Sequence, residues 1–190
     1  MIYFSSDHHF YHANVIRFCD RPYKDVEEMN EALVKNWNAV VKPEDTVYYL
    51  GDFSMALRPV ELYTKRLNGR KILIAGNHDW CFPGHKKSKT QEKAANVQQK
   101  YLTEGWDHIL VCDNITIGDE VVSMSHFPWK GDSTDTRFDD WRLEDDGGWL
   151  LCGHVHEKWQ RKNKMINVGV DVWDYKPVSI ETIKGIINGG

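Results

Sequence analysis

Acidic and imidazole side chains recur in this 190-residue chain directly after short apolar runs. The apolar run 72–75 is followed at once by Gly-Asn-His-Asp at 76–79. Open α/β sheets bind ligands at the carboxyl ends of their strands, so these polar residues would stand where a site is expected. Taken alone, the four residues also suit a polar turn, because Asn and Asp tolerate turn backbone. The pattern gains meaning only if other strands repeat it.

Four further stretches repeat this arrangement of an apolar run that stops at Asp or His, namely residues 4–9, 49–52, 123–126 and 151–156. The strand-end ligands are Asp7, His9, Asp52, Asn77, His126, His154 and His156. This set is too large for one ion, which takes about four protein ligands, and it suits two ions that share a ligand. Nitrogen and oxygen donors without thiolate favour Mn²⁺, Fe, Zn²⁺ or Ni²⁺ over Ca²⁺ or Mg²⁺. Within Asp-x-His and His-x-His, alternate side chains of an extended chain point the same way.

Five ordered blocks of this kind resemble the calcineurin-like metallophosphoesterases. The blocks are Asp7-x-His9, Gly51-Asp52, Gly76-Asn77-His78-Asp79, His126 and Gly153-His154-x-His156. The resemblance implies a four-layer α/β/β/α sandwich of two mixed sheets, formed by a single domain of residues 1–190. The site would lie at the strand ends. The segment Asn167-Val168-Gly169-x-Asp171 is also similar to the one that follows the last block in many members.

The resemblance further implies how two divalent transition-metal ions would be held, with Mn²⁺ the expected metal and Fe, Zn²⁺ or Ni²⁺ as alternatives. Asp7, His9 and His156 would hold the first ion, Asn77, His126 and His154 the second, and Asp52 would bridge them. His78 would stand beside the transferred phosphoryl group, and Asp79 would orient and charge-stabilise it.

The expected chemistry is hydrolysis of a phosphomonoester or phosphodiester, with a nucleotide among the candidate substrates. Two metals can clamp the attacking and leaving oxygens, and a shared water becomes a bridging hydroxide nucleophile. Two divalent ions, two carboxylates and one hydroxide leave the pocket near a charge of about +1, which favours a phosphate anion. His78 can donate to a phosphate oxygen or to the leaving alkoxide, worth ~10²–10⁴-fold in rate. A nuclease and an inactive metal-binding interaction module on the same fold remain alternatives.

Two residues near the first block are candidate substrate contacts. His12 follows His9 by three residues, and we expect it to touch the substrate phosphate. Arg21 is a second candidate, because guanidinium groups bind phosphate. A packing role for His12 and a surface salt bridge for Arg21 are the competing interpretations.

The elements that must position these residues can be read from periodicity. Strands are predicted at 2–5, 46–50, 71–75, 149–152 and 164–168, with three more between 108 and 125. Asp25 and Glu28 predict the start of a helix with a core-facing apolar stripe, and Ser88 and Gln91 predict another. Further helices are predicted at 59–67 and 179–187. Residues 127–148 show no clean period and suit either a lid or a solvent loop.

Composition limits the function classes. The net charge of −4 argues against long nucleic acid as partner. A lysine cluster at 86, 87, 89 and 93 suits a solvated face, or less readily a phosphate-facing patch. No apolar run approaches the roughly 20 residues of a membrane span, and no signal peptide is recognised at the start, so a cytoplasmic location is expected. The four cysteines form no Cys-x-x-Cys pair, which favours reduced packing thiols.

Overall fold

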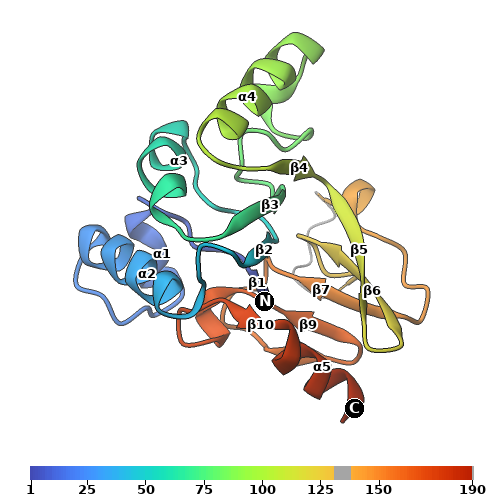
Figure 1. The fold of residues 1–190 in the computed structure, drawn as a ribbon. Coiled ribbons are helices and arrows are strands. Elements are labelled where there is room, and N and C mark those ends of the chain that lie inside the picture. Colours follow the sequence, from blue (N-terminus) through green and yellow to red (C-terminus); the bar gives the residue numbers. More distant parts are fainter. Residues whose placement is uncertain (131–137, 190) are drawn as a thin grey trace.

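Two five-stranded sheets pack face to face in the computed structural model, which describes residues 1–130 and 138–189 (Figure 1). The first sheet has the order β10-β1-β2-β3-β4. Its strands are β1 (Ile2–Ser5), β2 (Thr46–Tyr49), β3 (Arg70–Ile74), β4 (His108–Leu110) and β10 (Val178–Ser179). Strands β1 to β4 are parallel, and β10 runs antiparallel to β1. The carboxyl ends of β1, β2 and β3 therefore meet at one edge.

The second sheet has the order β5-β6-β7-β9-β8. Its strands are β5 (Cys112–Ile117), β6 (Glu120–Ser125), β7 (Trp149–Cys152), β8 (Arg161–Lys162) and β9 (Met165–Asn167). The β5–β6 and β8–β9 pairs are antiparallel, whereas β6, β7 and β9 run parallel. Both sheets are mixed, which confirms the expected α/β class built on two mixed sheets. Strands β6 and β7 also end together, beside the site-bearing edge of the first sheet.

The core between the sheets follows from alternation along the strands. Successive side chains of a strand point to opposite faces. In β1, Phe4 is fully buried between the sheets, while Tyr3 packs on the outer face. In β7, Leu151 faces the first sheet, whereas Leu150 joins a smaller cluster on the far face. Both faces of these strands are thus covered, as expected for parallel strands.

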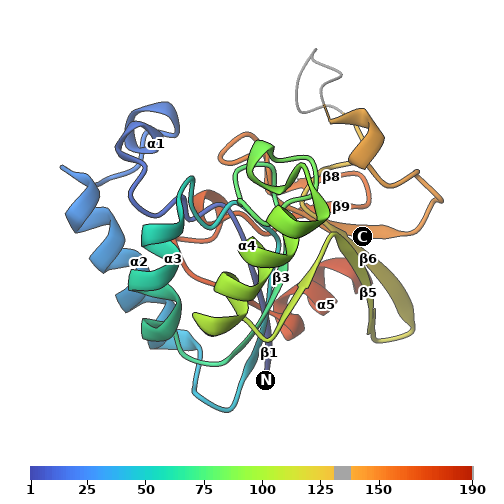
Figure 2. The same ribbon diagram turned by 90° about the horizontal axis from the view of Figure 1, so that it is seen from above.

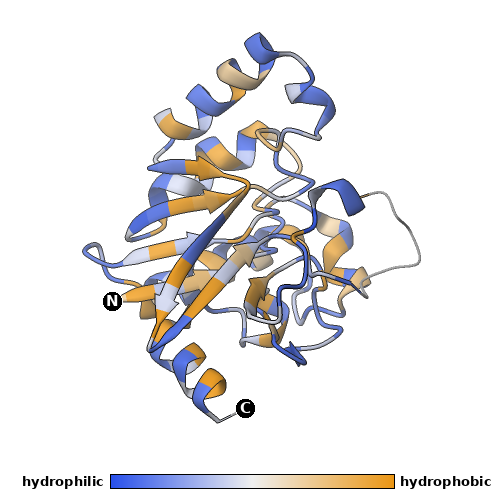
Figure 3. Ribbon diagram, turned by 90° about the vertical axis from the view of Figure 1, so that its right-hand side faces the viewer, coloured by the Kyte–Doolittle hydropathy of each residue, from blue (hydrophilic) through white to orange (hydrophobic). Residues whose placement is uncertain are grey.

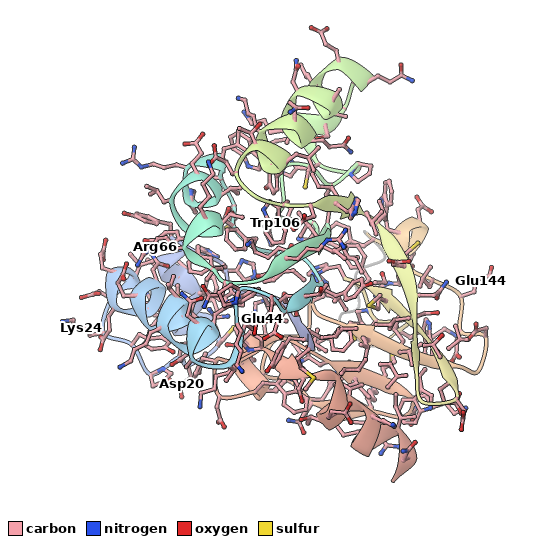
Figure 4. All side chains as sticks on the ribbon, viewed as in Figure 1. Asp20, Lys24, Glu44, Arg66, Trp106 and Glu144 are labelled. Carbon is pink, nitrogen blue, oxygen red and sulfur yellow. The ribbon has the colours of Figure 1, made fainter. Side chains whose placement is uncertain are left out.

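The outer face of the first sheet is covered by helices. These are α1 (Ala13–Phe18), α2 (Val26–Val40), α3 (Leu57–Tyr63) with the 3-10 turn η1 (Thr64–Arg66), and α4 (Gln91–Thr103). Figures 1 and 2 show α1, α2 and α3 on the side turned away from the second sheet. Trp37 of α2 and Tyr101 of α4 are fully buried in the same cluster as Tyr49 of β2. Trp106 also lies inside this layer, edge-on to Phe53 (Figure 4).

Helix α5 (Ile180–Asn188) closes the chain against β1 and β10. Its Ile183 and Ile187 belong to the cluster between the sheets. Figure 3 shows α5 alternating between hydrophobic and hydrophilic residues, as expected of a helix with one buried face. The remaining 3-10 turns are η2 (Lys86–Ser88), η3 (Asp139–Trp141) and η4 (Val170–Val172). None of the helices in residues 1–130 and 138–189 has the length and hydropathy of a membrane-spanning segment.

Local sequence signals predicted some boundaries and missed others. Asp25 caps α2 as predicted, accepting from the Glu28 amide at 2.8 Å. The predicted cap at Ser88 is wrong, because its hydroxyl donates to the Trp80 carbonyl and Thr90 caps α4 instead. Within the irregular stretch 127–148, residues 138–148 contain η3 and no longer helix. The centre of that stretch, 131–137, lies outside the described residues. The choice between a lid and a solvent loop therefore stays a prediction.

Candidate metal centre

Five of the seven predicted ligands have left-handed backbone. Their φ angles are 60° at Asp7, 52° at His9, 59° at Asp52, 69° at His154 and 50° at His156. Non-glycine residues with positive φ are uncommon, although Asp and His tolerate them better than most. Such strain persists where the surrounding structure enforces it, and it clusters at functional sites. The loops after β1, β2 and β7 therefore hold these side chains in conformations that ordinary loops avoid.

A glycine precedes a candidate ligand at two places where a Cβ atom would come too close to another loop. A Cβ on Gly153 would lie 2.6 Å from Asp7 Oδ2, and one on Gly76 would lie 2.7 Å from the Asp52 amide nitrogen. Real Cβ atoms do not approach other atoms so closely. Each glycine thus lets the backbone of its loop lie directly against Asp7 or Asp52, which belong to the loops after other strands.

The first group of candidate ligands consists of Asp7, His9 and His156, whose potential ligand atoms lie within 4.8 Å of one another. His9 is 2% exposed, and neither of its ring nitrogens has a hydrogen-bond partner among the described residues. His156 Nδ1 pairs with Asp171 Oδ2 at 3.2 Å, which leaves Nε2 to bind a metal. A carboxylate behind a ligating histidine is the usual support of such a site.

The second group consists of Asp52, His126 and His154, again within 4.8 Å of one another. His126 Nδ1 donates to the Leu50 carbonyl at 2.7 Å, so Nε2 is the nitrogen that can bind a cation. Asn77 Oδ1 lies 3.3 Å from this Nε2. The amide oxygen of Asn77 therefore lies beside the second group.

Asp52, a member of the second group, also faces the first group. Its Oδ2 is 3.7 Å from His9 Nε2 of the first group and 3.4 Å from His126 Nε2 of the second. Burial alone would raise the pKa of this carboxyl, but His126 and the other imidazoles hold it well below its usual range. The Asp52 side chain is therefore a buried carboxylate aimed at both groups.

The electrostatics of the centre favour positive charge. Burial opposes protonation of His126, yet Asp52 outweighs it and raises the pKa of His126 to about 9. Burial likewise opposes protonation of His156, but Asp171 and Asp7 help to raise its pKa to about 11. Burial lowers the pKa of His9 well below its usual value. A field that holds protons on buried imidazoles would equally hold a cation.

These residues fit a pair of divalent ions. A buried imidazole with both nitrogens unpaired is costly, because it has lost water and gained no partner. His9 is such a group, and a metal would supply its missing partner. The donor set combines imidazole nitrogens, carboxylates and one amide oxygen, which suits Mn²⁺, Fe, Zn²⁺ or Ni²⁺.

A cleft of about 480 Å³ opens beside the first group and brings the predicted substrate contact His12 together with His9, His78 and His156. The His78 side chain is 38% exposed, and its Nε2 lies 3.9 Å from Asp52 Oδ2. His12 Nδ1 is buried without a hydrogen-bond partner in the described part of the chain. Both histidines thus line a space that adjoins the candidate ligands His9 and His156.

The structure gives Asp79 a different task from the predicted orientation of His78. Its carboxylate accepts from the backbone amides of Asp52, Phe53 and Gly76, at 2.8, 3.0 and 2.9 Å. Burial and then the charge of Asp52 raise the pKa of Asp79 to about 7, whereas the three amides favour the ionised form. Asp79 therefore ties together the loops that carry Asp52 and Asn77.

Arg21 also has partners that differ from the predicted substrate phosphate. Its side chain is fully buried and forms two hydrogen bonds with Asp171, Nε to Oδ1 at 2.7 Å and Nη2 to Oδ2 at 2.9 Å. It also donates to the Asp7 and His8 carbonyls at 2.7 and 2.9 Å. Because the guanidinium is enclosed by these acceptors, it positions the first group of ligands and does not reach the cleft.

Asp171 is the residue that the predicted site did not include. The similarity of residues 167–171 to the family segment was the signal that pointed to it. Asn167 completes this support, because its Nδ2 donates to the His156 and Trp159 carbonyls at 2.7 and 2.9 Å. The loop that carries His156 is thus fixed by side chains from residues 167–171.

Cys19 stands near this support, with a ligand atom within 4.8 Å of those of His156 and Asp171. Burial raises the pKa of its thiol, which disfavours the thiolate. Asp171 is already paired with the Arg21 guanidinium, whose positive charge would repel a cation. These facts favour the predicted packing role of this cysteine over a metal ligand.

Comparison with known proteins agrees with this geometry. A family model described as calcineurin-like phosphoesterase matches residues 1–158. An uncharacterized protein of Methanocaldococcus jannaschii is 36% identical over 200 residues, covering 100% of this chain and 92% of that protein. The gene 66 protein of Mycobacterium phage L5 is 31% identical over 205 residues, covering 98% of this chain and 93% of its own. The crystal structure of a protein of unknown function from Aquifex aeolicus is similar, with a TM-score of 0.70, 32% identity and 98% of each chain covered.

Proposed function

Because this chain belongs to the calcineurin-like phosphoesterase family, we propose that it is a metal-dependent hydrolase of phosphomonoesters or phosphodiesters. One observation carries the proposal: two groups of metal-ligand residues adjoin across the Asp52 carboxylate. Two divalent ions, when bound, would supply Lewis acidity toward phosphate oxygens and a water of lowered pKa. Manganese is the metal that we propose first.

The residues that would bind the two ions are held in position by the fold before any ion binds. Asp7, His9 and His156 would hold one ion, and Asn77, His126 and His154 the other, with Asp52 shared. Hydrogen bonds that the rings donate to the Leu50 carbonyl and the Asp171 carboxylate fix the orientation of His126 and His156. The centre therefore needs little rearrangement to accept its cations, and this preorganisation favours catalysis.

His78 would act on the phosphoryl group. Its backbone amide donates to Asp52 Oδ1 at 2.9 Å, which anchors the residue while its ring faces the cleft. The ring can donate to a phosphate oxygen or give a proton to the leaving oxygen. His12, on the same cleft, would contact a second phosphate oxygen.

The walls of this cleft suit an ester with an apolar or aromatic group. Phe18 is 71% exposed and Met55 is 43% exposed, and both line the cleft beside the histidines. Large apolar side chains exposed together at a cleft are typical of ligand sites. A small phosphate ester, such as a nucleotide, is the proposed substrate class.

The test is hydrolysis of p-nitrophenyl phosphate and its bis-ester by metal-depleted protein reloaded with Mn²⁺, Ni²⁺ or Zn²⁺. Asp52→Asn should abolish turnover, whereas Asp119→Asn, on the exposed β5–β6 turn, should leave it intact. Metal uptake without turnover on either ester would refute the proposal and favour an inactive metal-binding module.

A further inference from the structure

A second cleft, of about 460 Å³, lies between α4 and the segment that follows His78. Its apolar lining consists of Leu57, Trp80 and Val97. Its volume falls in the range of small-molecule sites, about 300–1,000 Å³. These three residues, called the apolar floor below, give the cleft an apolar surface besides its charged groups.

Four lysines also line the cleft, namely Lys86, Lys87, Lys93 and Lys100. All four residues are exposed, and none pairs with a carboxylate among the described residues. Among the described residues that line the cleft, none is acidic. Lys87 Nζ lies 4.7 Å from the centre of the Trp80 ring. A chain of net charge −4 thus concentrates unpaired positive charge beside an aromatic ring.

The second cleft adjoins the first. Trp80 Nε1 donates to the Met55 carbonyl at 2.8 Å, and Met55 lines the cleft that contains His9 and His78. Trp80 follows His78 by two residues. One hydrogen-bonded pair of residues therefore forms the boundary between the metal centre's cleft and the lysine-rich one.

We propose that the second cleft binds a nucleotide of a short single-stranded nucleic acid whose neighbouring phosphodiester lies at the metal centre; this rests on the proposed function. Positive grooves with aromatic side chains are how proteins bind single strands, because every base has a face that stacks and every linkage carries a charge. A bare polyphosphate would use the lysines and leave the apolar floor unused. A base on Leu57, Trp80 and Val97 with phosphates on the lysines would use both.

The test measures binding and turnover separately. Binding of a fluorescent hexanucleotide is followed by anisotropy, with Mn²⁺ present, for wild-type protein, Lys93→Glu/Lys100→Glu and Lys35→Glu/Lys184→Glu. The control pair makes the same charge change at exposed positions outside the cleft. We expect Lys93→Glu/Lys100→Glu to weaken binding at least tenfold and the control to change it less than twofold. The salt dependence, d log K/d log[salt], should become shallower by about 1.4, since each single-strand phosphate contact contributes roughly 0.7.

Hydrolysis of bis-p-nitrophenyl phosphate, which is too small to span both clefts, should be equal in all three proteins. Hexanucleotide binding that is undetectable in wild-type protein, or equally weakened in both variants, would overturn the inference. Displacement of the hexanucleotide by tripolyphosphate as effectively as by unlabelled hexanucleotide would overturn the role of the base. If no protein hydrolyses the bis-ester while binding still depends on Lys93 and Lys100, the proposed function fails and the binding site stands.

Discussion

Asp171→Asn tests how much the buried ion pair between Arg21 and Asp171 contributes to stability. The substitution keeps the size of the side chain but removes the charge that faces Arg21. Both side chains are nearly inaccessible, 0% exposed at Arg21 and 1% at Asp171, so water cannot replace the lost partner. Breaking a buried ion pair from one side typically costs 3–5 kcal/mol, because a charge is left uncompensated. Arg21 keeps its bonds to the Asp7 and His8 carbonyls, which places the expected loss at about 3 kcal/mol.

The same substitution should weaken metal binding. Asp171 also pairs with His156 Nδ1, and loss of such a supporting carboxylate costs about 10–100-fold in metal affinity. Urea unfolding of the metal-depleted protein measures the first effect, and Mn²⁺ titration against a chelating dye measures the second.

A second variant separates charge from positioning. Arg21→Met/Asp171→Leu removes both charges, so it should recover part of the stability lost in Asp171→Asn, reduced by the loss of the Arg21 donors to the Asp7 and His8 carbonyls. It should not recover metal affinity, because His156 still lacks its carboxylate. Stability of Asp171→Asn within 1 kcal/mol of wild type, together with unchanged Mn²⁺ affinity, would refute this reasoning.

Three further predictions concern separate features of the chain. Gly153→Ala should lower metal affinity sharply, because its Cβ would displace Asp7 Oδ2; unchanged dye competition would contradict this. Asp25→Ala should destabilise the protein by about 1 kcal/mol through loss of the α2 cap, measured by urea unfolding, with activity unchanged. Mn²⁺ affinity should rise with pH between 6 and 8, by about tenfold per pH unit for each proton released on binding. The reason is that the pKa values of His126 and His156 are raised to about 9 and 11, so both rings carry protons in the metal-free protein that the ions must replace. A flat pH profile would show that these rings are not ligands.

Much of the fold follows from signals that are local in sequence. Asp25 and Glu28 predict the start of α2 because a cap is an interaction between residues three apart. The apolar runs of β1, β3 and β7 predict strands because a strand that is buried on both faces reads as a continuous apolar run, without alternation of apolar and polar residues. The short strands β8 and β10, two residues each, give no such signal and were not predicted.

The candidate ligands can be recognised in the sequence by residue type, whereas the residues that support them cannot. Asp-x-His and Gly-His-x-His are local patterns that indicate candidate ligands, whereas the grouping of Asp7, His9 and His156 around one ion is implied by the family resemblance. The Arg21–Asp171 pair joins residues 150 positions apart, and nothing within either neighbourhood indicates the other. For the same reason the sequence suggests a substrate contact for Arg21 and a partner in His78 for Asp79, whereas Arg21 bonds to the Asp7 carbonyl and Asp79 to the Asp52 amide on other loops.

The most direct test of the shared Asp52 carboxylate is anomalous diffraction at the manganese edge from crystals grown with Mn²⁺. We expect two manganese peaks roughly 3.5–4 Å apart, with the Asp52 carboxylate in contact with both. A single peak, or two peaks of which neither touches Asp52, would contradict the account.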